Sequence, residues 1–276
     1  MQEAHAFAPG NISCFFKIHP QNDPRWRGSL GLGFTVNEGV LVTVTKARET
    51  TILFNDRKMD FLPVRYVIDH LTKETVKIVI TSPLPLGCGF GLSGASALAT
   101  AYALNTLFSL EKLPKDLAIL AHTADAFHQT GLGDVVNQFF GGFLVKLKPS
   151  SEFTVQKIPL TRIPVYYAYF SELSTVAVLS DRSLQEKIND AASEALSEVE
   201  KALKKSVRFR DLIDISYVYC KKSGLLQDRQ TKDTIAAIQR SNGHASMIIL
   251  GNAVYSDIPF EGSKKLMISD IKAHIL

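Results

Sequence analysis

The segment from Pro85 to Ala95, PLGCGFGLSGA, has the residue pattern best suited to chemistry in this sequence. Glycine occupies four of the eight positions from 87 to 94. Closely spaced glycines let the backbone approach a ligand and turn its N–H groups toward it. The Ala- and Leu-rich stretch that follows predicts a helix, whose N-terminus adds unpaired N–H donors and the positive end of the helix dipole. A purely structural turn needs only one or two glycines, so the pattern indicates an anion cradle and favours phosphate.

Two common phosphate motifs can be compared with this segment. Residues 89–94 match G-x-G-x-x-G, but a dinucleotide fold needs a strand running straight into the glycines and a second strand soon after the helix. Here Pro83 and Pro85 intervene, and a second helical pattern follows the first. A P-loop is excluded as well, because no Gly-Lys-Ser/Thr closes the segment. The predicted phosphate site is therefore of another kind.

The elements that must position this segment are strand-like and helical patterns mixed in both halves of the chain. Period-2 patterns and β-branched runs predict a hairpin across 33–44, with its turn at 37–39, and strands at 77–80, 143–147, 166–170, 175–179 and 245–250. Helical periodicity, prolines and glycines predict helices at 95–108, 114–128, 134–140, 183–205, 210–222 and 228–240. This order predicts an α+β fold of two domains, residues 1–155 with a mixed sheet and the glycine-rich loop, and residues 156–276 with a second α+β unit.

Composition excludes several classes of protein. The 276 residues are 46% hydrophobic and 21% charged, which is typical of a globular chain and excludes disorder, collagen and coiled-coil arrays. The net charge of +4, without a long basic block, does not predict a nucleic-acid partner. We find no run of 18 apolar residues and no signal peptide, so we expect no membrane association and a cytoplasmic location. Three widely spaced cysteines speak against disulfides and a zinc site.

The glycine-rich segment resembles the motif P-x-G-x-G-L-G-S-S-A-A of the GHMP kinases, the family named for its galactokinase, homoserine, mevalonate and phosphomevalonate members. It departs from the motif at Leu92, where the family has its first serine, and at Gly94. The resemblance implies that Ser93 faces Mg²⁺ and the nucleotide phosphates. It also implies an ATP-binding segment that consists of Pro85, Gly87, Cys88, Gly89, Phe90, Gly91, Leu92, Ser93, Gly94 and Ala95.

Two further segments support the resemblance. Residues 8–12, APGNI, resemble the A-P-G-K motif on the substrate side of the fold, with Asn11 in place of the usual lysine. The glycine turn 130–133 with Asp134, and the Gly-Gly pair after it, resemble the family's G-x-x-D…G-G segment. The resemblance implies that Asp134 is the base for the substrate hydroxyl and that Gly133 lies beside the substrate. A carboxylate at such a junction can approach a bound alcohol, although aspartate is also common as a helix N-cap.

The helix predicted at 114–128 would supply further site residues. Family members have a Glu on this helix that joins the serine at Mg²⁺, and the matching residue here is Asp125, which is one methylene shorter. We therefore expect its contact with the metal to run through water. One of the two histidines, His122 and His128, is expected to be structural, and His128 is the candidate for contact with the substrate. The family's third motif is weak here, in residues 242–252.

Residues 89–93, GFGLS, and the N-terminal motif with Asn11 resemble the archaeal pantoate kinases within the family. In that group the glycine loop reads G-F-G-h-S, where h is apolar, and the N-terminal motif lacks its lysine. The resemblance implies ATP-dependent phosphorylation of the primary hydroxyl of (R)-pantoate to 4-phosphopantoate, in coenzyme A biosynthesis. Arg27 would hold the pantoate carboxylate, because arginine can donate two parallel hydrogen bonds to it. Mevalonate, homoserine or shikimate as the substrate, and a non-catalytic metabolite-binding regulator, stay open as alternatives. The chain could act as a homodimer.

Overall fold

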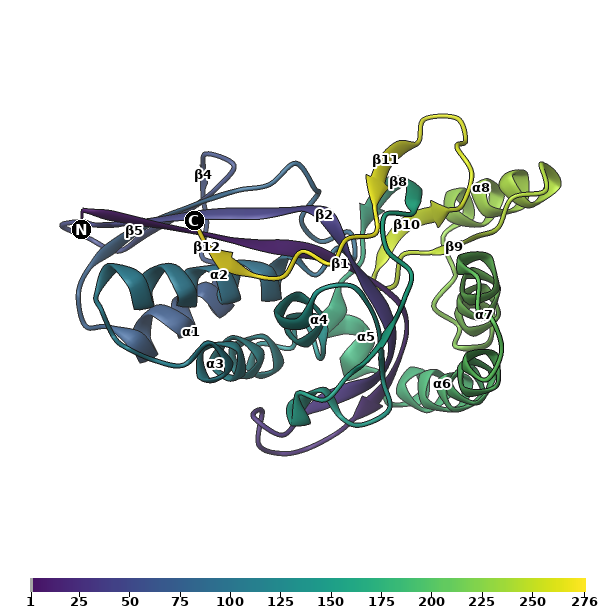
Figure 1. Cartoon of the computed structure of the whole chain (residues 1–276), viewed down its shortest axis with the longest axis horizontal. Helices are drawn as coiled ribbons and strands as arrows, with labels where there is room; N and C mark the ends of the chain where they lie inside the picture. Colours follow the sequence, from purple (N-terminus) through teal and green to yellow (C-terminus); the bar gives the residue numbers. More distant parts are fainter. Residues whose placement is uncertain (1) are drawn as a thin grey trace.

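The structure is a computed structural model that describes residues 2–276. Two long antiparallel strands, β1 (Glu3–His19) and β2 (Gly28–Lys46), pair along their whole length (Figure 1). The predicted hairpin at 33–44 is wrong, because both of its halves belong to β2. Gly39 does not turn the chain: a Cβ there would lie 2.1 Å from the Ala8 carbonyl oxygen, so the glycine lets β2 pass close to β1. The pairing is irregular at this point, where the register shifts.

The first sheet has eight strands and is mixed. Besides β1 and β2 it contains β3 (Thr51–Phe54), β4 (Arg57–Lys58), β5 (Val76–Thr81), β6 (Phe143–Lys146), β7 (Gln156–Ile158) and β12 (His274–Ile275). The order is β12-β1-β2-β5-β3-β4, with β6 paired to another part of β2 and β7 paired to β6. Strands β3 and β5 are parallel, whereas the other pairs are antiparallel. The predicted strands at 77–80 and 143–147 are confirmed as β5 and β6.

Four helices cover one face of this sheet (Figure 1): α1 (Leu62–Leu71), α2 (Leu92–Leu107), α3 (Pro114–Phe127) and α4 (Asp134–Phe140). The three predicted helices in this region are confirmed as α2, α3 and α4. Helix α2 is buried along almost its whole length, since its many alanines allow close packing against β1, β2, α1 and α3. The helix that starts at the glycine-rich loop is therefore rigidly held in the core.

The second sheet has the order β11-β8-β10-β9, built from β8 (Pro164–Glu172), β9 (Ala245–Met247), β10 (Gly251–Ser256) and β11 (Lys264–Met267). The connecting helices are α5 (Thr175–Ser180), α6 (Arg182–Leu203), α7 (Phe209–Lys222) and α8 (Arg229–Arg240), and a 3₁₀ turn spans Ser150–Glu152. The strand at 166–170 and the helices at 183–205, 210–222 and 228–240 are confirmed as β8, α6, α7 and α8.

Two predicted strands in this half are wrong in whole or in part. Residues 175–179 form α5, because the Ser174 hydroxyl accepts a hydrogen bond from Ala177 N and starts a helical turn despite the β-branched residues. The strand predicted at 245–250 ends at Met247, and Leu250 has a left-handed φ of 62°. The α+β class with two sheets is confirmed, whereas the division at residues 155/156 stays a prediction.

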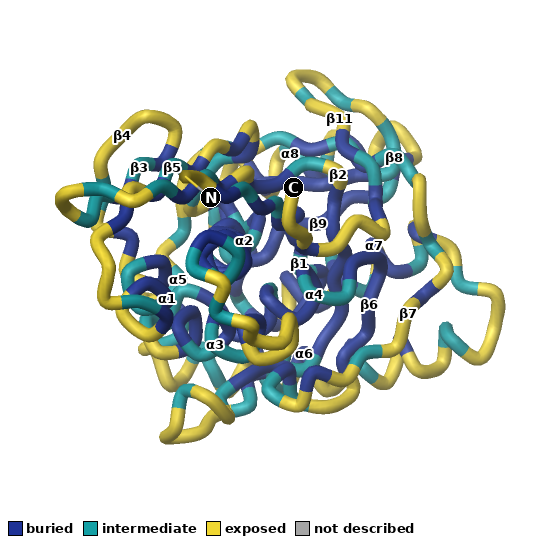
Figure 2. The backbone as a smooth tube through the Cα atoms, turned by 60° about the vertical axis from the view of Figure 1, so that its left-hand side comes forward, coloured by how far each residue is buried: buried dark blue, intermediate teal, exposed yellow. Residues whose placement is uncertain are grey.

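The buried residues form a core that runs through both sheets, with the exposed residues gathered in loops and helix surfaces (Figure 2). Cys14, Cys88 and Cys220 are all buried and free. No helix within residues 2–276 is long and apolar enough to cross a membrane.

Candidate active site

A cavity of about 630 Å³ opens beside the glycine-rich loop. Its walls come from β1 and β2, the segment leading into α1, the turn before α4, the end of β6, α5 with the residues before it, and the turn at Ile249 and Leu250. Of the predicted ATP-binding residues, those that line the cavity are Gly87, Gly89, Phe90, Gly91, Leu92 and Ser93, whereas Pro85, Cys88, Gly94 and Ala95 do not line it.

The loop has a backbone that requires glycine. Gly87, Gly89 and Gly91 all have positive φ, at 77°, 84° and 62°. Gly91 is the N-cap residue of α2, so the loop delivers the chain directly into the first turn of a buried helix. A Cβ at Gly89 would lie 2.5 Å from the carbonyl oxygen of Ile249, and so the loop packs against the second sheet's turn. The first turn of α2 has N–H groups without a partner inside the helix, and such groups can bind an anion.

Three oxygen-bearing side chains meet at one end of this wall. The Ser93 hydroxyl donates to Asp125 Oδ1 at 2.8 Å and lies 2.9 Å from Thr130 Oγ1. The Thr130 hydroxyl donates to the same Asp125 oxygen at 2.6 Å. Burial raises the pKa of Asp125 to about 7, against the lowering effect of its hydrogen bond from Thr130. Gly131 is needed beside it, because a Cβ there would lie 2.1 Å from Asp125 Oδ2.

Asp134 is the first residue of α4 and faces the cavity. The helix N-cap is Gly133, and the Asp134 side chain turns instead toward β1. Its Oδ1 accepts hydrogen bonds from Asn11 Nδ2 at 2.6 Å and from the Ser13 hydroxyl at 3.3 Å. Burial raises the pKa of Asp134, while Lys146 and these two hydrogen bonds act in the opposite direction. The predicted residues Asn11, Gly133 and Asp134 are thus brought together.

Lys146, at the end of β6, is a site residue that the sequence analysis missed. Its side chain is buried, lines the cavity and donates to Gly133 O at 3.0 Å. Burial lowers the pKa of Lys146 to about 8, and the charge of Asp134 limits that shift. The signal in the sequence was a lysine that directly follows three apolar residues in a predicted strand. The structure shows that all four residues of this strand are buried. Among the described residues that line the cavity, Lys146 is the sole cation.

Other missed residues are hydroxyls and an amide that support these groups: Ser13, Ser29, Thr130 and Gln138. Gln138 follows Asp134 by one turn of α4 and donates from Nε2 to Gly91 O at 2.8 Å. It therefore ties the helix of the acid to the glycine-rich loop. Thr130 lies in the glycine turn 130–133 that the sequence analysis singled out, but no motif assigns a role to its side chain or to those of Ser13, Ser29 and Gln138, so only the fold reveals them.

Arg27 and His128 lie outside the cavity. The Arg27 guanidinium donates to Gln21 O at 3.1 Å and to Ala126 O at 3.2 Å, and it lines a smaller adjoining cavity of about 420 Å³. His128 packs edge-on against Tyr66. His122 is fully buried with Nε2 2.9 Å from Arg27 O, and burial lowers its pKa to about 4.

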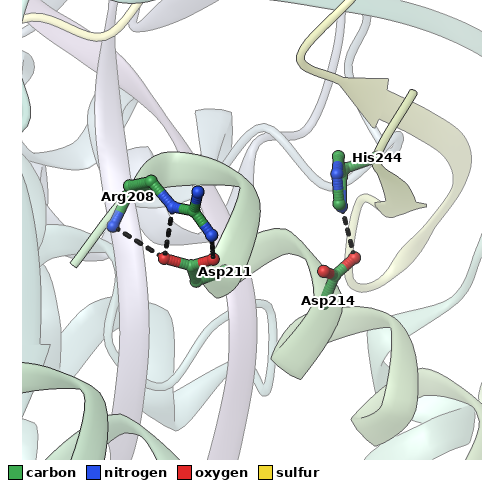
Figure 3. A network of polar contacts seen from close by, with 4 residues as sticks. All are labelled: Arg208, Asp211, Asp214 and His244. Atoms are coloured by element: carbon green, nitrogen blue, oxygen red, sulfur yellow. Dashed lines mark hydrogen bonds and ion pairs between the residues drawn. The ribbon is translucent and has the colours of Figure 1, made fainter. Parts of the chain in front are cut away.

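The weak third motif contributes through its backbone. A Cβ at Gly251 would lie 2.2 Å from the Cys88 carbonyl oxygen, so this glycine allows the turn to support the glycine-rich loop. His244 from the same segment points elsewhere. It pairs with Asp214 on α7 at 2.7 Å, next to the Arg208–Asp211 pair that caps the start of that helix (Figure 3). This surface network joins α7 to β9 and does not line the cavity.

Comparison with known proteins identifies relatives of this chain. A family model described as the GHMP kinases N terminal domain matches residues 62–142. A pantoate kinase of Methanospirillum hungatei is 29% identical over 259 residues, which are 91% of this chain and 86% of that protein. A pantoate kinase of Methanocaldococcus jannaschii is 30% identical over 256 residues, 90% of each chain.

A solved structure titled "Phosphotransferase related to CoA biosynthesis pathway" shares the fold, with a TM-score of 0.85, 24% identity and coverage of 99% of this chain and 98% of that one. The sequence matches extend through both halves of the chain, beyond the part that carries the glycine-rich loop. The chain therefore belongs to the GHMP kinase family, on the branch of the pantoate kinases.

Proposed function

We propose that the protein transfers the γ-phosphate of ATP to the primary hydroxyl of (R)-pantoate and forms 4-phosphopantoate, a precursor of coenzyme A. The observation that carries the proposal is one cavity in which a glycine-rich phosphate loop faces an aspartate and a buried lysine. Relatives named pantoate kinase, aligned over about 90% of the chain, support the choice of substrate.

The loop wall would hold the ATP phosphates. Its glycines expose backbone N–H groups, and the N-terminus of α2 adds a positive dipole end. The cavity also contains three acids, Asp60, Asp134 and Glu172, against one lysine. Bare ATP would be repelled by this charge, which favours a nucleotide whose phosphates are partly neutralised by a divalent cation.

The residues present fit a magnesium ion at Ser93 and Asp125. Magnesium prefers oxygen ligands and takes one or two carboxylates together with phosphates and water. Residues 2–276 hold no group of three or more His, Cys, Asp or Glu side chains suited to a metal, so hydroxyl and phosphate oxygens would complete the shell. When bound, the ion would supply positive charge that neutralises the phosphates during transfer.

Asp134 would act on the acceptor hydroxyl. Within the described residues, both side-chain hydrogen bonds to its carboxylate go to Oδ1, which leaves Oδ2 for a bound alcohol. Asn11, in place of the family's lysine, fixes the orientation of the carboxylate. The raised pKa of Asp134 makes it a stronger base than an exposed aspartate, so it can take the hydroxyl proton as the new bond to phosphorus forms.

Lys146 would hold the pantoate carboxylate. It is the cavity's cation, and the hydroxyl of Ser29, which lines the same cavity, can donate to an anion as well. Arg27, the residue expected from the sequence for this role, has two of its N–H groups engaged by carbonyl oxygens and lines the adjoining cavity. The proposal therefore moves the carboxylate contact from Arg27 to Lys146.

An assay of ADP release by the purified protein tests this function. (R)-Pantoate, mevalonate, homoserine and shikimate would be compared at equal concentrations with ATP and Mg²⁺. We expect turnover with (R)-pantoate to exceed that with each of the other alcohols by at least about a hundredfold. The reason is that only an acceptor of the right shape places its hydroxyl at Asp134 and its carboxylate at Lys146 at the same time. Preference for another alcohol would replace the substrate, and no turnover with any of them would favour a binding protein without catalysis.

Two further expectations belong to the same proposal. ATP is a cytoplasmic metabolite, so the enzyme is proposed to act in the cytoplasm. A homodimer is proposed as its assembly state. The mass measured by light scattering, at a protein concentration near that of the assay, distinguishes a dimer from a monomer.

A further inference from the structure

Ser93 Oγ, Thr130 Oγ1 and Asp125 Oδ1 form a triangle of oxygens at the end of the phosphate wall. Its edges measure 2.8, 2.9 and 2.6 Å. Asp125 is buried at the back, whereas Ser93 and Thr130 line the cavity. The triangle therefore turns one side toward the space in which the nucleotide phosphates would lie.

The size of this triangle matches one face of a magnesium shell. In an octahedron with Mg–O distances of about 2.1 Å, neighbouring oxygens lie about 3 Å apart. The Ser93 and Thr130 hydroxyls supply two hydrogen atoms for the three edges of the triangle. When Asp125 is a carboxylate, the two oxygens of one edge therefore lie next to each other without a hydrogen between them. A cation on the open side would relieve that contact.

The backbone fixes Thr130 in this place. Helix α3 ends in a turn in which Gln129 has a left-handed φ of 55° and Thr130 N donates to Asp125 O at 3.0 Å. This turn folds the Thr130 side chain back over the carboxylate of Asp125, five residues earlier in the chain. Gly131 then leaves room for Asp125, since a Cβ would collide with Oδ2.

We propose that Thr130 is a third protein ligand of the magnesium ion, with Ser93 and Asp125, and that Asp125 contacts the ion directly. The inference rests on the proposed function, because the ion arrives with the nucleotide. It replaces the water-bridged contact expected from the short side chain of Asp125. In this arrangement the Thr130 hydroxyl adds the oxygen that keeps the site compact around the shorter acid.

Metal binding in the absence of pantoate tests the proposal. The affinity of the enzyme–ADP complex for Mg²⁺ is measured by calorimetry for the parent, Thr130→Val, Thr130→Ser and Thr123→Val. Thr123, on helix α3 before the turn that carries Thr130, is a matched control whose hydroxyl donates to Ile119 O. We expect Thr130→Val to weaken Mg²⁺ binding by about tenfold, and Thr130→Ser and Thr123→Val to bind Mg²⁺ as the parent does. ADP binding in the presence of a chelator should be the same in all four proteins.

A second readout counts the ligands. With Mn²⁺ in place of Mg²⁺, broadening of the electron paramagnetic resonance lines by ¹⁷O-labelled water reports the waters bound to the ion. Thr130→Val should bind one more water than the parent, because water takes the place of the lost hydroxyl. Equal Mg²⁺ affinity and equal water number in Thr130→Val and the parent would overturn the Thr130 ligand alone. A parent protein that binds no metal–nucleotide complex would overturn the proposed function as well.

Discussion

Replacing Lys146 by arginine should shift the alkaline limit of activity while the cavity keeps its positive charge. Lys146 is buried, and burial lowers its pKa to about 8. If the protonated lysine holds the substrate carboxylate, kcat/KM for pantoate falls as this group loses its proton. Arginine stays protonated throughout the accessible range, so the limb that belongs to Lys146 should disappear in Lys146→Arg.

The pKa sets the size of the effect. With a pKa of about 8, about 90% of Lys146 is protonated near pH 7 and about 10% near pH 9. The parent's kcat/KM should therefore fall by about tenfold over this range, since kcat/KM reports groups of the free enzyme. Lys146→Met removes the charge at every pH and should raise the KM for pantoate by about a hundredfold or more, the range expected for a lost buried ion pair of about 3 kcal/mol.

The assay is ADP release at saturating ATP as a function of pH, with Lys157→Met as the control. Lys157 lies on the neighbouring strand β7 and its Nζ donates to Phe140 O, outside the cavity. Its variant should keep the parent's pH profile and KM. An alkaline limb that persists unchanged in Lys146→Arg, or a parental KM for pantoate in Lys146→Met, would refute the role of Lys146.

Further predictions concern stability and the site's glycines. The pKa of His122 is about 4 in the folded protein and about 6.5 in the unfolded chain, so protonation of His122 favours unfolding as the pH falls. Between pH 7 and pH 4 the parent should therefore lose about 3 kcal/mol of unfolding free energy relative to His122→Gln, as measured by urea denaturation. The raised pKa of Asp125 changes the stability in the opposite direction, but it affects the parent and the variant alike, so their difference reports His122 alone. An equal dependence of stability on pH in the parent and in His122→Gln would contradict this prediction. Gly131→Ala should displace the Asp125 carboxylate and weaken Mg²⁺ binding in calorimetry, and parental Mg²⁺ affinity would speak against this. Gly91→Ala should lower stability by about 1–2 kcal/mol for the left-handed φ and weaken ATP binding, whereas an unchanged melting temperature would contradict the strain.

Local sequence signals predicted the parts of the site that depend on local structure. The glycines of the phosphate loop and the helix after it follow from residue types within a short segment, so both could be predicted. The turn predicted at 37–39 is wrong because a glycine such as Gly39 is as typical of a hairpin turn as of a strand that passes close to its neighbour. The strand predicted at 175–179 is wrong because β-branched residues favour strands, whereas here the N-cap Ser174 starts a helix.

The remaining site residues depend on contacts between distant segments. Lys146 enters the cavity only because β6 pairs with β2, and Asn11 reaches Asp134 across 123 positions of the chain. Arg27 satisfied the chemical requirement for a carboxylate contact, but the fold turns its guanidinium to the carbonyl oxygens of Gln21 and Ala126. Residue type alone cannot distinguish such a supporting arginine from one that faces a ligand.

The most direct test of the central claim is turnover of (R)-pantoate by the parent and by Asp134→Asn, with phosphorus NMR to identify the product. Asparagine keeps the size of the side chain and loses the base. We predict 4-phosphopantoate from the parent, a rate lower by about 10²–10⁴ in the variant, and unchanged ATP affinity. The melting temperature should stay within a few degrees of the parent's, because Asp134 does not cap its helix. Near-parental turnover by Asp134→Asn would remove the base, and a parent that forms no 4-phosphopantoate would contradict the proposed function.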